Sequence, residues 1–171
     1  MSGAPPIPRA TYRLQLNKDF RFADAGALAP YLGRLGISHA YLSPILKARR
    51  GSTHCYDTVD HAELNPELGT YEDFFRMAAA FRAEGIGIIA DFVPNHMGIG
   101  GDENPYWLDV LERGRGSRYA GWFDIAWGPY EPTLSGKVLV PFLAKPYGDA
   151  LTEGDLELRF EALTGSFAIW L

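Results

Sequence analysis

Three polar side chains, Asp91, Asn95 and His96, follow directly after a short apolar run at residues 86–90. If that run is a strand of a parallel α/β sheet, its carboxyl end is where such folds build their sites. A carboxylate, an amide and an imidazole together offer donors and acceptors suited to the hydroxyl groups of a ligand. The same segment also suits an ordinary turn, in which Pro94 shapes the chain and His96 is structural. The residue types alone leave both interpretations open.

A second candidate lies in the segment 51–57 (GSTHCYD), within a long polar stretch. Tyr56 offers a flat apolar platform for the C–H face of a sugar ring, and Asp57 offers a hydrogen-bond acceptor beside it. A barrel would place this loop on the same face as Asp91. The alternative is a surface loop with a packed tyrosine.

Four side chains in this region are competent metal ligands: His54, Cys55, Asp57 and His61. Their spacing matches no common zinc pattern, so we predict no metal site. Large aromatic residues farther along the chain are more often core or interface than ligand platforms, and we leave them out of the predicted site. They are Trp107, Trp122, Phe123 and Trp127.

The elements that must position these residues begin with a strand at 10–16, where apolar and polar residues alternate. Apolar residues at helical spacing predict a helix over 22–35, and the short apolar stretch 37–42 predicts a second strand. Strand, helix and strand within this length form one βαβ unit.

A long Gly-rich and polar loop is predicted over 46–69, followed by a helix over 70–84 with a capping box formed by Thr70 and Asp73. The near-continuous apolar run 86–90 is typical of a strand that is buried on both faces. The order βαβαβ predicts a parallel α/β sheet, either barrel or doubly wound.

The pattern changes beyond residue 104. A further helix is predicted over 105–113, and short strands are predicted over 138–141, 156–160 and 166–170. This segment is expected to be an antiparallel insertion instead of a fourth βα unit.

Composition limits the class of protein. The chain has 171 residues, is 47% hydrophobic and carries a net charge of −5, with its Lys and Arg scattered, which argues against a nucleic-acid partner. No apolar run approaches the roughly 18 residues of a membrane span, and residues 1–8 lack the pattern of a secretory leader. The single cysteine, Cys55, excludes an internal disulfide. We therefore predict a cytoplasmic protein with no membrane partner.

An ordered series of motifs resembles the α-amylase superfamily, specifically the maltooligosyl trehalose synthase family. The motifs are 11–15 (TYRLQ), 43–44 (SP), 54–57 (HCYD), 65–69 (NPELG) and 91–96 (DFVPNH). Later segments at 121–125, 137–141 and 145–148 fit as well, so the similarity runs through nearly the whole chain.

The resemblance implies an α/β fold in which residues 8–103 form the first three βα units of a TIM (β/α)₈ barrel. Residues 104–171 would be a partly antiparallel insertion after the third strand, not complete in this chain. In that family, the position of Asp91 supports the catalytic centre, and the position of His96 hydrogen-bonds the sugar at the cleaved linkage.

The resemblance also implies roles for three neighbouring positions. The position of Asn95 shapes the loop, that of Tyr56 stacks under the same sugar, and Asp57 belongs to the same motif. One departure stands out, since the family usually has Gly where this chain has Cys55. If the backbone needs a positive φ there, Cys55 strains the loop.

The activity implied by the resemblance is that of an isomerase. An intramolecular transglycosylation converts the reducing-end α-1,4 linkage of a maltooligosaccharide into the α,α-1,1 linkage of trehalose, with no cofactor. A retaining mechanism needs two carboxyl groups about 5–5.5 Å apart. The family's nucleophile and general acid come from later strands, so we assign no catalytic residue and expect the isolated chain to be inactive.

Two alternatives remain. The chain could be a non-catalytic maltooligosaccharide-binding fragment or part of another α-amylase-superfamily glycoside hydrolase, because a shared fold does not fix the reaction. The expected partners are a maltooligosaccharide and the remaining C-terminal part of such an enzyme, since an incomplete barrel leaves strand edges unpaired.

Overall fold

Three parallel strands form the central sheet of the N-terminal part. The computed structural model describes residues 7–170, so residues 1–6 and Leu171 lie outside the described residues. The strands are β1 (Thr11–Leu14), β2 (His39–Leu42) and β5 (Gly87–Ala90), in the order β1-β2-β5. The predicted α/β class and parallel sheet are therefore confirmed, and the sheet does not close into a barrel within the described chain.

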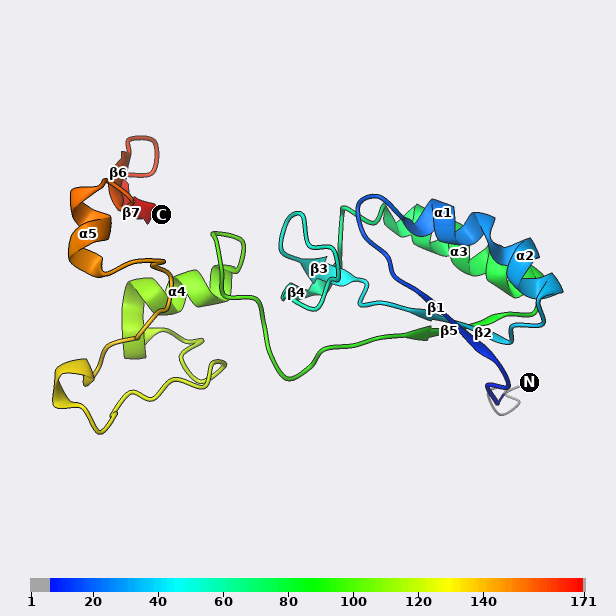
Figure 1. Cartoon of the computed structure of the whole chain (residues 1–171), viewed down its shortest axis with the longest axis horizontal. Helices are drawn as coiled ribbons and strands as arrows, with labels where there is room; N and C mark the ends of the chain where they lie inside the picture. Colours follow the sequence, from blue (N-terminus) through cyan, green and yellow to red (C-terminus); the bar gives the residue numbers. More distant parts are fainter. Residues whose placement is uncertain (1–6, 171) are drawn as a thin grey trace.

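Helices cover one face of this sheet (Figure 1). They are α1 (Phe22–Ala27), α2 (Ala29–Arg34) and α3 (Tyr71–Ala83). Phe22 and Phe81 are fully buried between the helices and the sheet. Burial of such large apolar side chains holds the layers together.

The predicted helix over 22–35 is two short helices that meet at Leu28. Pro30 lies in the first turn of α2. Proline has no N–H to bond to the carbonyl four residues earlier, so a single continuous helix cannot pass through this position without losing a hydrogen bond. The amphipathic spacing correctly predicts helical structure over 22–35 but does not predict the break at Leu28.

Strand register separates the side chains of the sheet into two faces. Leu14 pairs with Leu42, and both are buried in the core under the helices. Successive side chains of a strand point to opposite faces, so the row formed by Arg13, Tyr41 and Ile89 lies on the face away from those helices.

The predicted capping box at the start of α3 is confirmed. The amide of Asp73 donates to Thr70 Oγ1 at 3.2 Å, and the amide of Thr70 donates to Asp73 Oδ2 at 2.9 Å. The backbone hydrogen bond from Thr70, helped by the Arg76 side chain, lowers the pKa of Asp73 to about 2. A carboxylate at this end of a helix also meets the positive end of the helix dipole.

The segment predicted as one long loop over 46–69 contains two strands, so that prediction is wrong in part. β3 (Leu46–Ala48) and β4 (Thr58–Leu64) pair in antiparallel fashion, with shifts of register between successive pairs. Short bulged strands lack a clean alternation, which explains why the pattern did not reveal them. The turn between them, 49–57, carries Tyr56.

The C-terminal part begins with α4 (Pro105–Arg113), whose bounds are those of the predicted helix. Asn104 caps it, because its Oδ1 accepts from the amides of Tyr106 at 3.1 Å and Trp107 at 3.0 Å. Near the end of the chain, β6 (Glu157–Glu161) and β7 (Ser166–Trp170) form an antiparallel pair. The last two predicted strands are therefore confirmed.

The predicted strand at 138–141 is wrong, since the described chain is irregular there. Pro141 cannot donate to a strand ladder, and no neighbouring strand is recorded beside this segment within 7–170. Three short helices in this part were not predicted: η1 (Gly114–Gly116), η2 (Pro132–Leu134) and α5 (Tyr147–Thr152).

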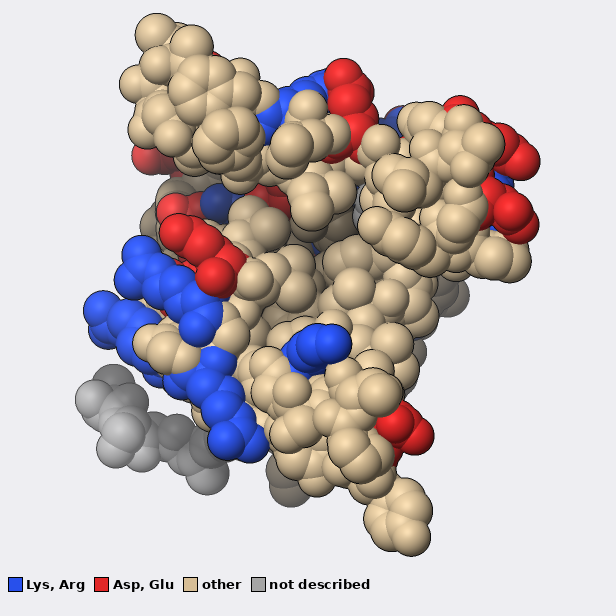
Figure 2. Space-filling model, turned by 90° about the vertical axis from the view of Figure 1, so that its left-hand side faces the viewer, with Lys and Arg blue, Asp and Glu red and all other residues tan. Residues whose placement is uncertain are grey.

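The β6–β7 pair carries largely exposed apolar side chains on one face, where Leu158 pairs with Ile169 and Phe160 pairs with Phe167. Figure 2 looks onto this end of the molecule and shows a front surface made mostly of uncharged residues. The exposed side chains include Leu158, Phe160, Phe167 and Ile169.

Within the part of the chain that the structure describes, no helix is both long enough and apolar enough to cross a bilayer. The division between residues 8–103 and 104–171 stays a prediction.

Candidate functional site

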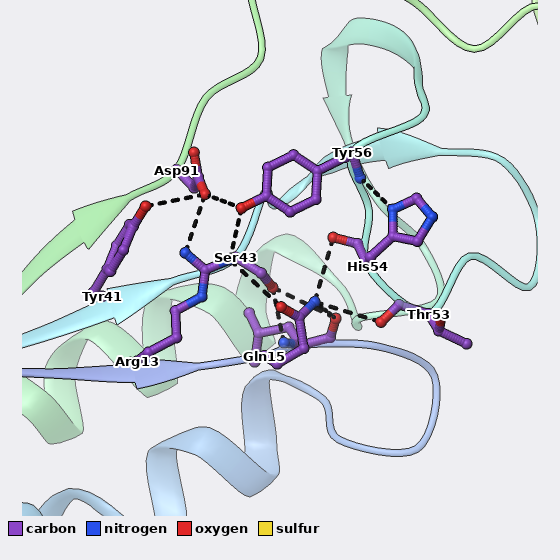
Figure 3. A network of polar contacts seen from close by, with 9 residues as sticks. Arg13, Gln15, Tyr41, Ser43, Thr53, His54, Tyr56 and Asp91 are labelled. Atoms are coloured by element: carbon purple, nitrogen blue, oxygen red, sulfur yellow. Dashed lines mark hydrogen bonds and ion pairs between the residues drawn. The ribbon is translucent and has the colours of Figure 1, made fainter.

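Asp91 is the centre of a polar network at the carboxyl end of β5 (Figure 3). Its Oδ2 accepts hydrogen bonds from Arg13 Nη1 at 3.0 Å, from the Tyr41 hydroxyl at 3.2 Å and from the Tyr56 hydroxyl. The Asp91 amide donates to Leu42 O at 3.1 Å, which continues the sheet by one residue. Three strands and the 49–57 turn thus converge on one carboxylate oxygen.

The electrostatics fix the protonation of this network. The hydrogen bond from Tyr56 holds the pKa of Asp91 below its ordinary value of 3.8, and those from Arg13 and Tyr41 act in the same direction, against the opposing effect of desolvation. The same bond to Asp91 raises the pKa of Tyr56 above 10.0. At neutral pH the site therefore contains an ionised carboxylate and a protonated phenol.

Arg13 joins the other members. Its guanidinium carbon lies 4.4 Å from the centre of the Tyr41 ring, and its Nη2 donates to the Tyr56 oxygen at 2.9 Å. The side chains of Arg13 and Asp91 are 32% and 17% exposed, so their ion pair is partly shielded from water. Sequence reasoning missed Arg13 and Tyr41 as site residues. The available signal was the alternation in β1, which puts Arg13 on the face opposite Leu14.

The backbone of the 49–57 turn is held by Gln15. Its Nε2 donates to Thr53 O at 3.4 Å and to His54 O at 3.3 Å. The Tyr56 amide donates to His54 Nδ1 at 3.0 Å, and the two rings stack with centres 6.1 Å apart. These contacts fix the position from which Tyr56 reaches Asp91.

Cys55 has a φ of +61° and is the only non-glycine residue with a positive φ among residues 7–170. The backbone therefore has the left-handed conformation that favours glycine, so a Cβ at this position is strained. The side chain is fully buried, and Asn65 Nδ2 lies 3.5 Å from its sulfur. Burial raises the pKa of the Cys55 thiol. The Cys55 amide donates to Ser52 Oγ at 3.0 Å.

His96 lies beside the network but does not contact Asp91. Its Nε2 is 3.0 Å from Tyr56 O, and a ring nitrogen facing a carbonyl oxygen must carry the proton. The imidazole is exposed. The structure therefore brings together three of the predicted site residues: Tyr56, Asp91 and His96.

The other two predicted site residues lie apart from this network. Asp57 Oδ1 accepts from Ser52 Oγ at 2.5 Å, and its backbone oxygen accepts from Arg49 N at 3.2 Å. Asn95 is exposed in the bend after β5, and within 7–170 no hydrogen bond is recorded from its side chain to the network. In the same described part, no three potential metal ligands gather at one point.

Comparison with known proteins identifies the family to which the chain belongs. A model described as "Alpha amylase, catalytic domain" matches residues 28–155. A Mycobacterium tuberculosis protein described as a maltooligosyl trehalose synthase is 44% identical over 163 residues, which cover 87% of this chain and 21% of that protein. A maltogenic α-amylase of Bacillus acidopullulyticus is 40% identical over 95 residues, covering 56% of this chain and 15% of that enzyme.

Solved structures agree. A crystal structure of a maltooligosyl trehalose synthase matches with a TM-score of 0.84 at 36% identity, covering 95% of this chain and 21% of that one. Maltooligosyltrehalose synthase from Arthrobacter ramosus matches with a TM-score of 0.78 at 38% identity, covering 91% and 19%. The chain thus spans about a fifth of the length of these relatives. It belongs to the α-amylase family and is similar to the N-terminal region of the maltooligosyl trehalose synthases.

Proposed function

We propose that this chain is the N-terminal, maltooligosaccharide-binding part of an intramolecular transglycosylase. The whole enzyme would convert the reducing-end α-1,4 linkage of a maltooligosaccharide into an α,α-1,1 linkage and so form a terminal trehalose unit. The observation that carries the proposal is the network of Arg13, Tyr56 and Asp91 at the carboxyl ends of parallel strands. The similarity to maltooligosyl trehalose synthases supports this reaction.

In this proposal, β1, β2 and β5 are the first three strands of a (β/α)₈ barrel, and residues 104–171 belong to an insertion after the third. Retention of configuration needs a nucleophilic carboxylate and an acid about 5–5.5 Å apart. We assign both groups to strands outside these 171 residues. The remaining part of the enzyme is then the protein partner of this chain.

The side chains described above bind and orient sugar. Tyr56 supports one face of the ring at the reacting linkage, and His96 hydrogen-bonds a hydroxyl of that ring. Asp91 stays ionised and fixes the Tyr56 hydroxyl. Asn95 and Asp57 shape the two loops. No step in this account requires a cofactor.

Sugar binding is tested by titrating the ¹⁵N-labelled chain with maltopentaose. We expect saturable shifts of amides around Tyr56 and His96, and their loss in Tyr56→Ala. Tyr31→Ala is the matched control, because Tyr31 is an exposed tyrosine of α2. An absence of shifts at millimolar sugar would contradict the proposal.

The reaction is tested in a chimera in which this chain replaces the matching N-terminal segment of the M. tuberculosis relative. We expect a trehalosyl product from maltopentaose. The likeness to a maltogenic α-amylase favours a hydrolase as the second candidate, which would release free malto-sugars instead. Binding by the chain with no activity in any such chimera would favour a non-catalytic binding role.

A further inference from the structure

The segment that links β5 to α4 (Figure 1) contacts both ends of the turn 49–57. Directly after the turn, Thr58 O accepts from the Gly98 amide at 2.8 Å. Near its beginning, the Arg50 amide donates to Glu103 Oε2 at 2.7 Å. A single segment therefore holds the turn at its two ends.

This segment and the turn lie unusually close together. A Cβ on Gly98 would lie 2.8 Å from Asp57 O, so only glycine lets the two backbones approach in this way. The Arg49 side chain fills the space beside Gly100, where a Cβ would lie 2.8 Å from its Nη1. With backbone packed against backbone, a displacement of the segment displaces the turn.

Glu103 is itself fixed by the residue that follows it. Asn104 is 1% exposed, caps α4 and donates through Nδ2 to Gly98 O at 2.9 Å. The position of Glu103 is therefore set by the start of α4, and the Glu103 side chain is the link from α4 to the beginning of the turn.

Two groups of Arg50 contact the Glu103 carboxylate, and they are not equivalent. The guanidinium Nε lies 3.4 Å from Oε1, but the Arg50 side chain is 80% exposed, whereas that of Glu103 is 22% exposed. An ion pair so open to water contributes little, while a backbone amide that donates to an ionised carboxylate forms a strong hydrogen bond. The next amide, that of Gly51, is held in the same way by Glu67 Oε2 at 2.9 Å.

We infer that Glu103 is a positioning residue for Tyr56. Its carboxylate holds the Arg50 amide and thereby the turn from which Tyr56 reaches Asp91. Through Glu103, the C-terminal part of the chain sets the geometry of the site without contacting the sugar. The consequence for sugar affinity rests on the proposed function, whereas the effect on the Tyr56 ring can be measured without any sugar.

The test measures two quantities in the full 171-residue chain: the ¹³Cζ signal of the Tyr56 ring, which reports its hydrogen bond to Asp91, and the affinity for maltopentaose. The signal is identified by its loss in Tyr56→Phe. Glu103→Ala should shift it and weaken binding about fivefold. A loss of stability alone would leave the signal and the affinity of the folded chain unchanged.

Substitutions at the two partners separate the amide from the ion pair. Arg50→Ala keeps the backbone amide and should change neither quantity, and Glu103→Gln keeps an acceptor oxygen and should restore most of the affinity. Glu103→Asp is one methylene too short, so it should act like Glu103→Ala and replaces it if that variant does not fold. Asp102→Ala is the matched control, because Asp102 is the adjacent, exposed acidic residue.

An unchanged Tyr56 signal and affinity in Glu103→Ala would overturn the inference and leave the proposed function standing. Equal effects of Arg50→Ala and Glu103→Ala would overturn the amide contact as the cause. If the original chain binds no maltopentaose, the proposed function fails, and the Tyr56 signal alone decides for or against the role of Glu103.

Discussion

The Tyr56 hydroxyl donates a hydrogen bond to Asp91 Oδ2, which ties the turn between β3 and β4 to the carboxyl end of β5. Tyr56→Phe removes this bond, while Arg13 and Tyr41 still contact the carboxylate. We expect a loss of about 1–2 kcal/mol in the free energy of unfolding at pH 7, measured in urea. Tyr31→Phe makes the same chemical change at an exposed site and should cost nothing measurable.

Asp91 makes stability depend on pH. Its pKa in the folded chain lies below 3.8, so its contribution is fully present above the unfolded pKa and is lost as the pH falls through the folded one. The difference in unfolding free energy between the original chain and Asp91→Asn should stay constant from about pH 7 to pH 5 and shrink below about pH 4. Asp102→Asn, in an exposed loop, is the control. A difference that persists unchanged at pH 3 would contradict the ionised network.

The positive φ of Cys55 predicts an unusual order of stability for two substitutions. Ala and Gly both remove the thiol, but only Gly also removes the strained Cβ, so Cys55→Gly should be more stable than Cys55→Ala by about 0.5–1 kcal/mol. Ala79→Gly, in the exposed middle of α3, should show the opposite order, with a loss of about 1 kcal/mol. Equal stability of the two Cys55 variants would mean that the left-handed backbone is not retained.

Burial should protect the Cys55 thiol from chemical modification. It is the only cysteine, it is fully buried, and burial raises its pKa, so little thiolate is present and none is accessible. Iodoacetamide at pH 8 should react slowly with the native chain and rapidly in urea, as followed by mass spectrometry. Thr53→Cys in a Cys55→Ala background moves the thiol two positions to an exposed residue and should react at once. Rapid labelling of native Cys55 would show that the turn opens readily.

The capping box of α3 gives a further prediction. Thr70→Ala removes the acceptor of the Asp73 amide and should lower the free energy of unfolding by about 1 kcal/mol. Thr70→Ser keeps a hydroxyl and should lose much less. Urea denaturation of the two variants at pH 7 makes the comparison, and equal losses would assign the effect to the methyl group instead of the cap.

The sequence predicted the elements whose signals are local. Regular apolar spacing revealed α3, and the capping box at Thr70 predicted where α3 begins. Strands β3 and β4 were missed because their pairing is bulged, and the strand at 138–141 was predicted from apolar residues that find no partner strand in the described chain. A local pattern of apolar and polar residues does not reveal which distant segments pair as strands.

The same distinction applies to the site. Asp91 was predicted because it directly follows a strand of the parallel sheet. Tyr56 was predicted because its loop would lie on the same face of a barrel as Asp91. Arg13 was missed because its role depends on the register that sets it beside Tyr41, a residue far away in the sequence. The strain at Cys55 was anticipated through the family's usual glycine, and its φ of +61° agrees.

The two pairings of the central sheet also differ in how much chain they enclose. β1 meets β2 across α1 and α2 alone, whereas β2 meets β5 only after β3, β4 and α3 have intervened. Closing the longer loop costs more chain entropy, so the first βαβ unit should form early during refolding and β5 should dock later. Asp91 would then arrive with β5, and we expect the polar network to be assembled last, onto a scaffold that already holds Arg13 and Tyr41.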